Sequence, residues 1–209
     1  VVIPSKDVIL YDYASPKLEL VVIEGTLRFD DTADREFNAS YIMVKGWPSL
    51  GTMGKLQVGL EDSPFQHRAV ITLHGNRRSY EIPVYGAKVL AVRFGVLELH
   101  GKPVTSWTRL NRTAFAGDTI IELDAETGWK TGDQIVLAPT EFEPMEGERV
   151  FVKSVQQGGR IVEIDRALMH NHTAEWREDP DGWRDLSNIR GEVGLLSRNV
   201  VVQGDDESY

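Results

Sequence analysis

Short apolar runs separated by turn residues recur along the whole chain. The first clear run, Leu20–Ile23, leads through Glu24–Gly25 into Thr26–Phe29, where apolar and polar residues alternate. β-Branched and aromatic residues with Gly, Pro, Asp and Asn between the runs are typical of strands joined by tight turns. The pattern predicts an all-β fold with strands at Leu20–Ile23, Thr26–Phe29, Tyr41–Val44, Lys55–Val58, Ala69–Leu73, Val89–Val92, Val96–Leu99, Thr119–Leu123, Gln134–Leu137, Arg149–Val152, Arg160–Ile164 and Val193–Gln203.

No stretch of the chain has the pattern of an amphipathic helix of about ten or more residues. The best helical candidate is Ala174–Leu186, which contains Pro180 and Gly182. Both residue types interrupt helices, so we expect no long helix.

One internal similarity bears on the architecture. Val70–Gly75 and Val96–Gly101 both end in Leu-His-Gly, 26 residues apart. That offset is about one coil of a β-solenoid, in which equivalent positions stack on successive coils. The offset predicts His74 and His100 as vertical neighbours, and a coincidence of turn chemistry is the alternative.

The last apolar run, Val193–Gly204, is largely apolar on both faces and precedes Asp205–Asp206. Strands that are apolar on both faces are typical of parallel sheets covered on both sides. We therefore expect a parallel strand here and a native chain that continues into further coils.

Charge and composition narrow the function classes. The 209 residues include 23 Lys plus Arg and 32 Asp plus Glu, a formal charge of -9, which argues against nucleic-acid binding. The absence of Cys excludes disulfides, thiol catalysis and Cys-ligated zinc. No run approaches the roughly 18 apolar residues of a membrane span. There is no starting Met and no signal-peptide pattern, so we expect a segment of a longer protein that does not itself insert into a membrane.

Three of the six asparagines head an N-x-[ST] sequon without proline: Asn38, Asn111 and Asn171. Such sequons are acceptors for N-linked glycans in secreted proteins. They predict an extracellular or lumenal chain glycosylated at these three residues, with chance occurrence as the alternative.

The sequence shows no recognised catalytic, cofactor or metal motif. It lacks a phosphate loop, a nucleophile elbow, a zinc-protease helix and a dinucleotide fingerprint. The triplet His170–His172 is interpreted as a surface loop, with a weak metal pair as the alternative. Most acidic clusters stand beside turn residues, where Asp caps the backbone, and calcium at one of them is the alternative. The clusters are Asp30–Asp31, Glu61–Asp62, Asp179 with Asp181, and Asp205–Asp206.

A series of motifs in order along nearly the whole chain resembles the G-eight domain, which is named for its eight glycines. The final motifs also resemble the start of a parallel β-helix, as in the fibrocystin-like surface proteins. A more distant resemblance is to the cell-migration-inducing hyaluronan-binding proteins, whose insertion and cysteines between Trp107 and Trp129 this chain lacks. The motifs are Gly25–Asp30, Leu56–Phe65, Ala69–Gly75, Gly86–Leu90, Gly95–Lys102, Ser106–Leu110, Gly128–Phe142 and Glu192–Asn199.

The tryptophans raise the question of a sugar-binding surface. Buried turns explain Trp107 and Trp129 better, because each ends or begins a strand within the family pattern. Trp176 and Trp183 lie in the least regular and most polar region. These two are therefore the candidate glycan platform.

The resemblance implies an all-β fold, with a G-eight domain at residues 1–140 and connecting strands plus the first rungs of a right-handed parallel β-helix at 141–209. It implies a structural, adhesive module in the extracellular part of a large glycosylated cell-surface or ciliary protein. Expected partners are extracellular proteins or glycans and neighbouring domains of the same chain. The alternative is binding or depolymerisation of a hyaluronan-type glycan, by a non-catalytic binding module or by an enzyme. We expect no cofactor beyond the calcium alternative.

Overall fold

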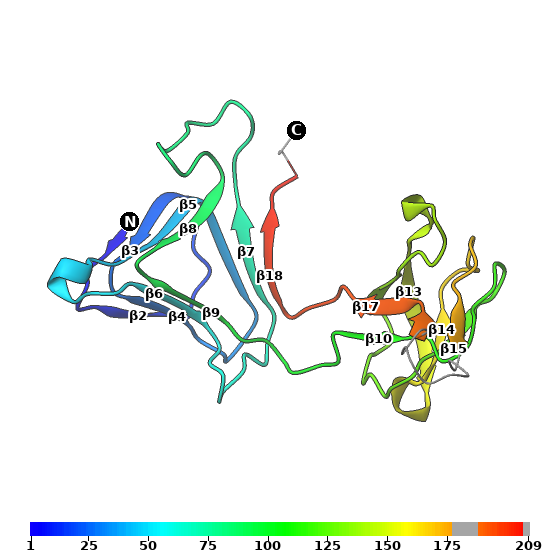
Figure 1. Cartoon of the computed structure of the whole chain (residues 1–209). Coiled ribbons are helices and arrows are strands. Elements are labelled where there is room, and N and C mark those ends of the chain that lie inside the picture. The colour runs from blue at the N-terminus through cyan, green and yellow to red at the C-terminus, as the bar shows by residue number, and fades with distance from the viewer. Residues whose placement is uncertain (177–187, 207–209) are drawn as a thin grey trace, which may run out of the picture. The chain divides into compact units, whose positions relative to one another are not determined.

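The computed structural model describes residues 1–176 and 188–206, with the side chains of Trp176 and Asn188 left aside. Within these residues the regular structure consists of strands and three short 3-10 turns, η1 (Pro48–Leu50), η2 (Pro144–Glu146) and η3 (Gln157–Gly159). The predicted all-β fold is confirmed. The chain divides into two compact units, which we call unit 1 (Val1–Pro103 with Arg198–Tyr209) and unit 2 (Val104–Ser197) (Figure 1).

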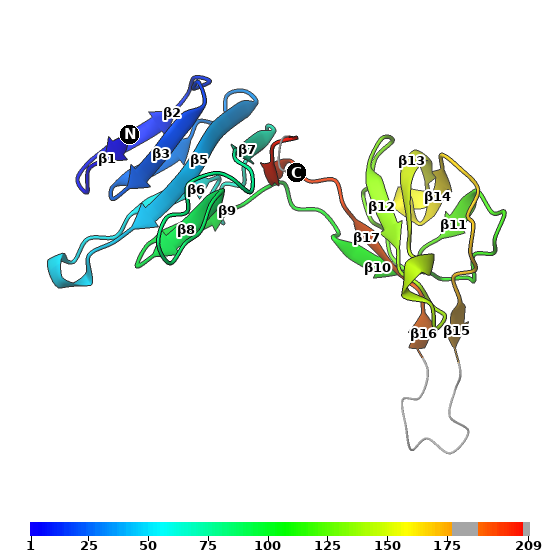
Figure 2. The same cartoon turned by 90° about the horizontal axis from the view of Figure 1, so that it is seen from above.

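Unit 1 is built from two parallel sheets, and from β1 to β6 the chain alternates between them (Figures 1 and 2). The first sheet contains β1 (Val2–Ile3), β3 (Leu18–Ile23), β5 (Arg35–Lys45), β7 (Ala69–Leu73), β8 (Val89–Arg93) and β18 (Val200–Gly204). The second sheet contains β2 (Val8–Tyr11), β4 (Thr26–Phe29), β6 (Lys55–Val58) and β9 (Val96–Leu99).

Strand β5 organises the first sheet because it is the longest strand in unit 1. Its N-terminal half pairs with β7 and its C-terminal half pairs with β8, both in parallel. Its other edge pairs with β3. Two successive strands of the chain therefore lie end to end along one partner.

The core of unit 1 lies between the two sheets. Alternate residues point inward, so Ile23, Ile42 and Leu56 are fully buried. The rings of Tyr11, Phe29 and Phe37 form a cluster with centroids 4.9 to 5.9 Å apart. Phe37 packs edge-to-face on the other two rings, and such packing adds to the stabilisation from burial.

Glycines stand where the chain turns from one sheet to the other. A Cβ on Gly25 would overlap the carbonyl oxygen of Pro4, and a Cβ on Gly54 would overlap that of Ile23. The same turns are hydrogen-bonded from coil to coil, because Lys55 N–H donates to Gly25 O (2.7 Å) and Val96 N–H donates to Gly54 O (2.9 Å). Backbone packs directly on backbone here, which only glycine permits.

Unit 2 is inserted between β9 and β18. Its main sheet is antiparallel, in the order β10–β17–β12–β13–β14–β11. A bridge between Leu110 and Leu123 joins the two outer strands, so the sheet closes into a barrel. The strands are β10 (Trp107–Arg109), β11 (Ile120–Glu122), β12 (Gln134–Leu137), β13 (Glu148–Gln156), β14 (Ile161–Ile164) and β17 (Glu192–Leu195), with the separate pair β15 (Ala174–Trp176) and β16 (Asn188–Arg190).

The barrel encloses its own core, separate from that of unit 1. Trp129 is buried, and its indole N–H donates to Thr105 O at 2.8 Å. The predicted burial of Trp129 is confirmed. The other fully buried large side chains of the barrel are Leu110, Ile121, Leu123, Ile135, Leu137 and Ile164.

Three predictions about local structure are corrected. The predicted strand Val193–Gln203 is two strands, antiparallel β17 in unit 2 and parallel β18 in unit 1. His74 follows β7 in the first sheet whereas His100 follows β9 in the second, so they are not stacked. The 26-residue offset spans β8 as well, and is therefore not one regular coil.

The remaining fold predictions are not decided. Residues 174–176 of the helical candidate form strand β15, and the rest of that candidate lies outside the described residues. The predicted boundary at residue 140 falls inside unit 2. The extent of the family domain and the β-helix rungs at 141–209 stay predictions.

Asn199 fixes the point at which the chain returns to unit 1. Its Nδ2 donates to the carbonyls of Phe65 (2.7 Å) and His67 (2.8 Å), and its Oδ1 accepts from Lys102 N (2.9 Å). The exit and return segments of the insertion are thus joined within unit 1 by one side chain. Ala69 N–H completes the contact by donating to Asn199 O at 2.7 Å.

We expect Asn199→Ala to lower the free energy of unfolding of unit 1 by about 2 kcal/mol, because three backbone groups lose their partner. Arg198→Ala, an exposed neighbour, is the matched control. Hydrogen exchange read by mass spectrometry separates the two units. Equal exchange of unit 1 in both variants would contradict the role given to Asn199.

Candidate functional site

The acidic clusters are held by the protein's own donors. Asp30 binds Thr32 and the Arg35 guanidinium, and these contacts, with the Thr32 hydrogen bond foremost, hold its pKa below the ordinary value. Asp31 accepts from the backbone N–H groups of Gln66 (2.7 Å) and His67 (3.0 Å). Burial raises the pKa of Asp31, but these hydrogen bonds outweigh it and the net shift is downward. Both residues act as turn anchors, as predicted for most clusters.

Metal ligation needs several such side chains at one point. Among residues 1–176 and 188–206, no group of three His, Asp or Glu side chains is placed to hold a metal ion. The clusters at Asp30–Asp31, Glu61–Asp62 and Asp205–Asp206 follow different strands, β4, β6 and β18. Asp179 and Asp181 lie outside the described residues.

A half-buried polar cluster follows β18 in unit 1. Asp205 accepts from Lys88 Nζ (2.7 Å) and Gly75 N (3.3 Å), and its Oδ2 lies 3.0 Å from His74 Nδ1. The other ring nitrogen of His74 lies 3.0 Å from Asn38 Oδ1. The cluster ties the end of β18 to β7 and β5. Sequence analysis had marked Asn38, His74 and Asp205 separately, and nothing in their spacing indicates that they meet.

A second polar cluster is buried in unit 2 around Glu148. Its Oε1 accepts from the backbone N–H groups of Met169 (2.8 Å) and His170 (2.9 Å) and lies 3.4 Å from His172 Nε2. Its Oε2 accepts from Arg166 at 3.1 Å. Burial raises the pKa of Glu148, yet these donors outweigh burial and hold the pKa below 4.5.

His172 is fully buried, so the interpretation of His170–His172 as a surface loop is wrong for this residue. Its Nδ1 lies 2.9 Å from Ala138 O, which can only accept. Its Nε2 faces Glu148 Oε1, so both ring nitrogens of His172 lie next to oxygen atoms. His172 and Glu148 are thus buried side by side, and their contacts anchor the loop to the segment after β12.

The three sequons differ in their surroundings. Asn171 is exposed, and its Oδ1 accepts from Ala116 N at 2.9 Å while its Nδ2 has no partner among the described residues. Asn111 is exposed, and its Nδ2 donates to Glu122 Oε1 at 2.7 Å. Asn38 is half-buried within β5, between β3 and β7. Asn171 thus offers the most accessible amide nitrogen.

The exposure of the tryptophans differs from the prediction at Trp107. Trp107 is 54% exposed, against the predicted burial, because it lies on outer strand β10 opposite Gly194. The Arg109 guanidinium lies 5.6 Å from its ring centroid. The side chain of Trp176 and all of Trp183 lie outside the described residues, so the predicted platform there stays a prediction. The exposed aromatic ring beside a cation is a feature that sequence analysis missed.

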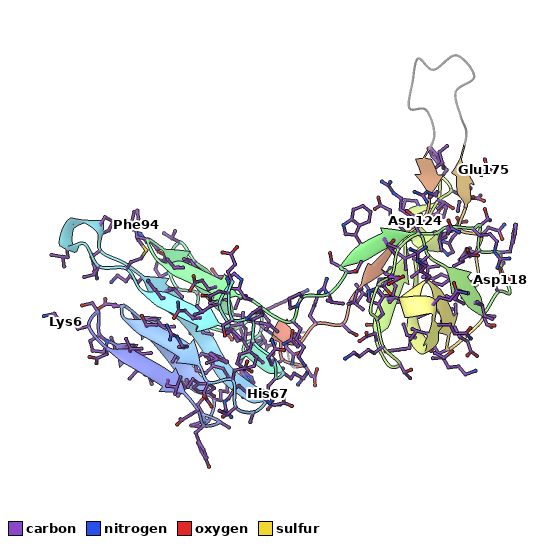
Figure 3. All side chains as sticks on the ribbon, turned by 90° about the horizontal axis from the view of Figure 1, so that it is seen from below. Lys6, His67, Phe94, Asp118, Asp124 and Glu175 are labelled. Carbon is purple, nitrogen blue, oxygen red and sulfur yellow. The ribbon has the colours of Figure 1, made fainter. Side chains whose placement is uncertain are left out.

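The other charged pairs of unit 2 lie closer to the surface. Arg190 binds Asp124 at 2.9 Å, and Arg109 lies 3.8 Å from Glu192. Figure 3 labels Asp124 and Asp118 on the barrel and His67 on unit 1. The Arg109–Glu192 pair is exposed and contributes little, whereas the Arg190 side chain is buried and meets an Asp124 that is exposed.

An apolar cavity of about 300 Å³ lies at the β1–β2 end of unit 1. It reaches the core side chains Val21, Leu27 and Phe37. Val2 on β1 and Val8 on β2 are exposed at this end, at 61% and 67%. Unit 1 therefore presents apolar surface beside its two outermost strands.

The Glu148 cluster makes a pH-dependent prediction. Because its pKa in the folded state is lowered, its stabilisation is complete above the ordinary value of 4.5 and is lost as pH falls through the folded pKa. We expect Glu148→Gln to cost about 2 to 3 kcal/mol at pH 7, less than a fully buried ion pair because the Arg166 side chain is partly exposed. The deficit should shrink below pH 4.5.

Denaturant unfolding at several pH values, followed by the fluorescence of Trp129, measures this deficit. Glu126→Gln is the control because Glu126 is exposed in the same unit. A deficit that stays constant from pH 7 to pH 3 would mean that the charge of Glu148 is not what stabilises the loop.

The chain is similar to several curated proteins along its whole length. It is 44% identical to fibrocystin-L of Homo sapiens over 209 residues, which is 99% of this chain and 5% of that protein. It is 41% identical to fibrocystin-L of Mus musculus, over 98% of this chain and 5% of the relative. It is 33% identical to fibrocystin of Canis lupus familiaris, again over 98% and 5%. The chain thus spans about a twentieth of these relatives.

Two further findings concern structure. A bacteriophage tailspike, solved in complex with an Acinetobacter baumannii capsular saccharide, aligns with 90% of this chain and 23% of its own at 12% identity and a TM-score of 0.34. That score is too low for an argument about fold. Within the described residues, no helix is long and apolar enough to cross a membrane.

The family is established by the match to a family model. The model of the G8 domain matches residues 1–111, more than half of the chain. These residues include the glycines at which the coils of unit 1 pack on each other and the expected motifs up to Leu110. This chain belongs to the G8 domain family.

Proposed function

We propose that the chain is a structural and adhesive module in the extracellular part of a large, glycosylated, fibrocystin-like surface or ciliary protein. The observation that carries the proposal is the in-register stack of parallel strands in unit 1, in a chain that spans about 5% of its fibrocystin-L relatives. Stacked strands joined by short glycine turns form a stiff scaffold, which a long ectodomain needs.

The surface of unit 1 supports a role among neighbouring domains. The apolar cavity and the exposed valines at the β1–β2 end are typical of surfaces that contact another protein rather than of surfaces that face solvent. A neighbouring domain of the same large protein is the partner that we propose for this end.

Glycosylation tests the extracellular location. Secreted from a eukaryotic host, the chain should lose mass on peptide-N-glycosidase treatment, and Asn111→Gln and Asn171→Gln should each remove one glycan. We expect the lowest occupancy at Asn38, because it is half-buried and contacts His74. A secreted chain with three unmodified asparagines would contradict the proposed location.

Adhesion needs its own measurement. Beads that display many copies of the secreted chain should attach to epithelial cells more strongly than beads with an unrelated secreted domain of similar net charge. Attachment no stronger than that of the control beads would leave the scaffold role and remove the adhesive one.

Glycan binding is the second candidate function, and Trp107 is the observation that favours it. Its exposed ring faces Gly194 across the strand pair, so no side chain from that position covers it, and Arg109 adds a positive charge beside it. Aromatic rings of this kind stack on sugar rings, and the cation suits an acidic sugar such as that of a hyaluronan-type polymer. The separation of the acidic clusters on different turns argues against depolymerisation, which needs paired carboxylates.

We expect Trp107→Ala to abolish retention of the chain on immobilised hyaluronan oligosaccharides. Trp47→Ala is the control, because Trp47 is also an exposed ring beside a cation, Lys45, but lies in unit 1. Equal retention of both variants and the unaltered chain would exclude the Trp107 surface as the glycan site.

A further inference from the structure

A second cavity, of about 230 Å³, lies on the outer face of the first sheet of unit 1. Its floor is Val22, Met43 and Ala91, which are register partners on β3, β5 and β8. Tyr85, from the segment between β7 and β8, completes the lining on one side. That segment is held in place because the Tyr41 hydroxyl donates to Tyr80 O.

Two cationic residues line this cavity from neighbouring strands. Lys45 and Arg93 are register partners on the parallel strands β5 and β8, and both line it. Like charges in such pairs are destabilising. Pairing Lys45 with Arg93 lowers stability, although the chain has a net charge of -9 and many acidic residues that could have paired with either cation. A bound anion would compensate for this cost.

The nearest carboxylate does not balance both cations. Lys45 Nζ lies 3.7 Å from Glu24 and 3.8 Å from the ring centroid of Trp47, and Glu24 also accepts from the indole N–H of Trp47 at 3.2 Å. Arg93 is exposed at the end of β8, and its guanidinium lies 5.9 Å from the ring centroid of Phe94, which Figure 3 labels. It has no carboxylate partner within residues 1–176 and 188–206. Among these described residues its one polar side-chain contact is long, 3.5 Å from Nη1 to the Tyr85 hydroxyl. A guanidinium is best satisfied by a carboxylate with two oxygens.

The apolar floor of the cavity favours an aliphatic group as the uncharged part of the ligand. The side chains of Val22, Met43 and Ala91 offer no hydrogen-bond partner. The polar side chains among the lining residues are those of Lys45, Arg93 and Tyr85. A sugar ring would lose water from several hydroxyl groups without replacement, which is unfavourable. An aliphatic group loses nothing there and gains contact with the floor. The volume suits one side chain rather than a larger ligand.

We infer that this cavity binds a polypeptide segment in which an aliphatic side chain adjoins a free carboxylate, as at a chain terminus that ends in Leu. The carboxylate lies between Arg93 and Lys45, and the aliphatic group covers Met43. This site is distinct from the Trp107 surface and goes beyond the scaffold role, because it requires neither glycans nor an extracellular location.

The probe is N-acetyl-leucine, titrated into the full chain and followed by methyl and arginine-Nε NMR signals. We expect shifts at the Met43, Ala91 and Val22 methyl groups and at Arg93. Arg93→Gln should weaken the apparent affinity about tenfold, since a hydrogen-bonded charge pair is lost. N-acetyl-leucinamide has no carboxylate, so its affinity for the unaltered chain should be lower than that of N-acetyl-leucine by a similar factor. Acetate has no aliphatic body, so it should shift the NMR signal of Arg93 but not those of the methyl groups.

Arg149→Gln is the matched control, because Arg149 is an exposed arginine of unit 2. Arg93 is itself exposed, so its variant should keep the methyl spectrum of the unaltered chain outside the cavity. Affinity unchanged in Arg93→Gln, or shifts spread away from the cavity, would overturn the inference. Tighter binding of glucuronate than of N-acetyl-leucine would also overturn it, since the cavity would then be a sugar-acid site.

Discussion

The structure of unit 1 depends on the contact of one coil's backbone with the next at the glycine corners. Strands in a parallel sheet are held about 4.8 Å apart by their hydrogen bonds, so the turns that join two such sheets must keep the same spacing. At Gly25 and Gly54 a side chain would occupy the position of a neighbouring carbonyl oxygen. With the corners closed in this way, the inward side chains of both sheets remain in register, and one continuous core can form.

The same register explains how the chain tolerates a whole barrel between two strands of one sheet. Strand β18 pairs with β7 although 126 residues separate Leu73 from Val200, and the pairing continues the hydrogen-bond pattern of the preceding strands. What the insertion requires is a fixed point at its base, and Asn199 supplies it by binding both the loop before β7 and the segment after β9. Within unit 2, Ser106 and Leu195 are also hydrogen-bonded, so the barrel's own ends meet. Each unit therefore closes its own hydrogen-bond network near the junction.

Sequence reasoning succeeded where local pattern decides the structure and failed where distant residues do. The strands Lys55–Val58 and Ala69–Leu73 were predicted with the bounds that are observed, because apolar alternation and turn residues mark them. The division into units was not predictable, since barrel and coil strands share the same short apolar pattern. His172 was interpreted as a surface-loop residue because its partner Glu148 is 24 residues away in the sequence. Trp107 was predicted to be buried because the sequence does not show that Gly194, which has no side chain, lies opposite it on the paired strand. Of the candidate sites, the sequons are visible in the sequence itself. The Lys45–Arg93 pair could not be predicted, because it depends on the pairing register of β5 and β8.

The polar and aromatic side chains considered as candidate sites are of two kinds, and the difference indicates which of them serve recognition. Histidines 67, 74, 170 and 172 each lie beside a carboxylate, an arrangement that in an enzyme would suggest acid–base chemistry. Here the carboxylates Asp31, Asp205 and Glu148 also accept backbone N–H groups, so their hydrogen-bonding capacity is spent on holding loops. Arg93 and Trp107 differ, because both are exposed beside apolar or glycine surface. Apart from the long contact of Arg93 with the Tyr85 hydroxyl, their polar and aromatic groups hold no loop among the described residues. A scaffold gains little from such residues, whereas a binding surface depends on them, and this contrast is the physical reason for placing recognition on the faces of the sheets rather than at the polar clusters.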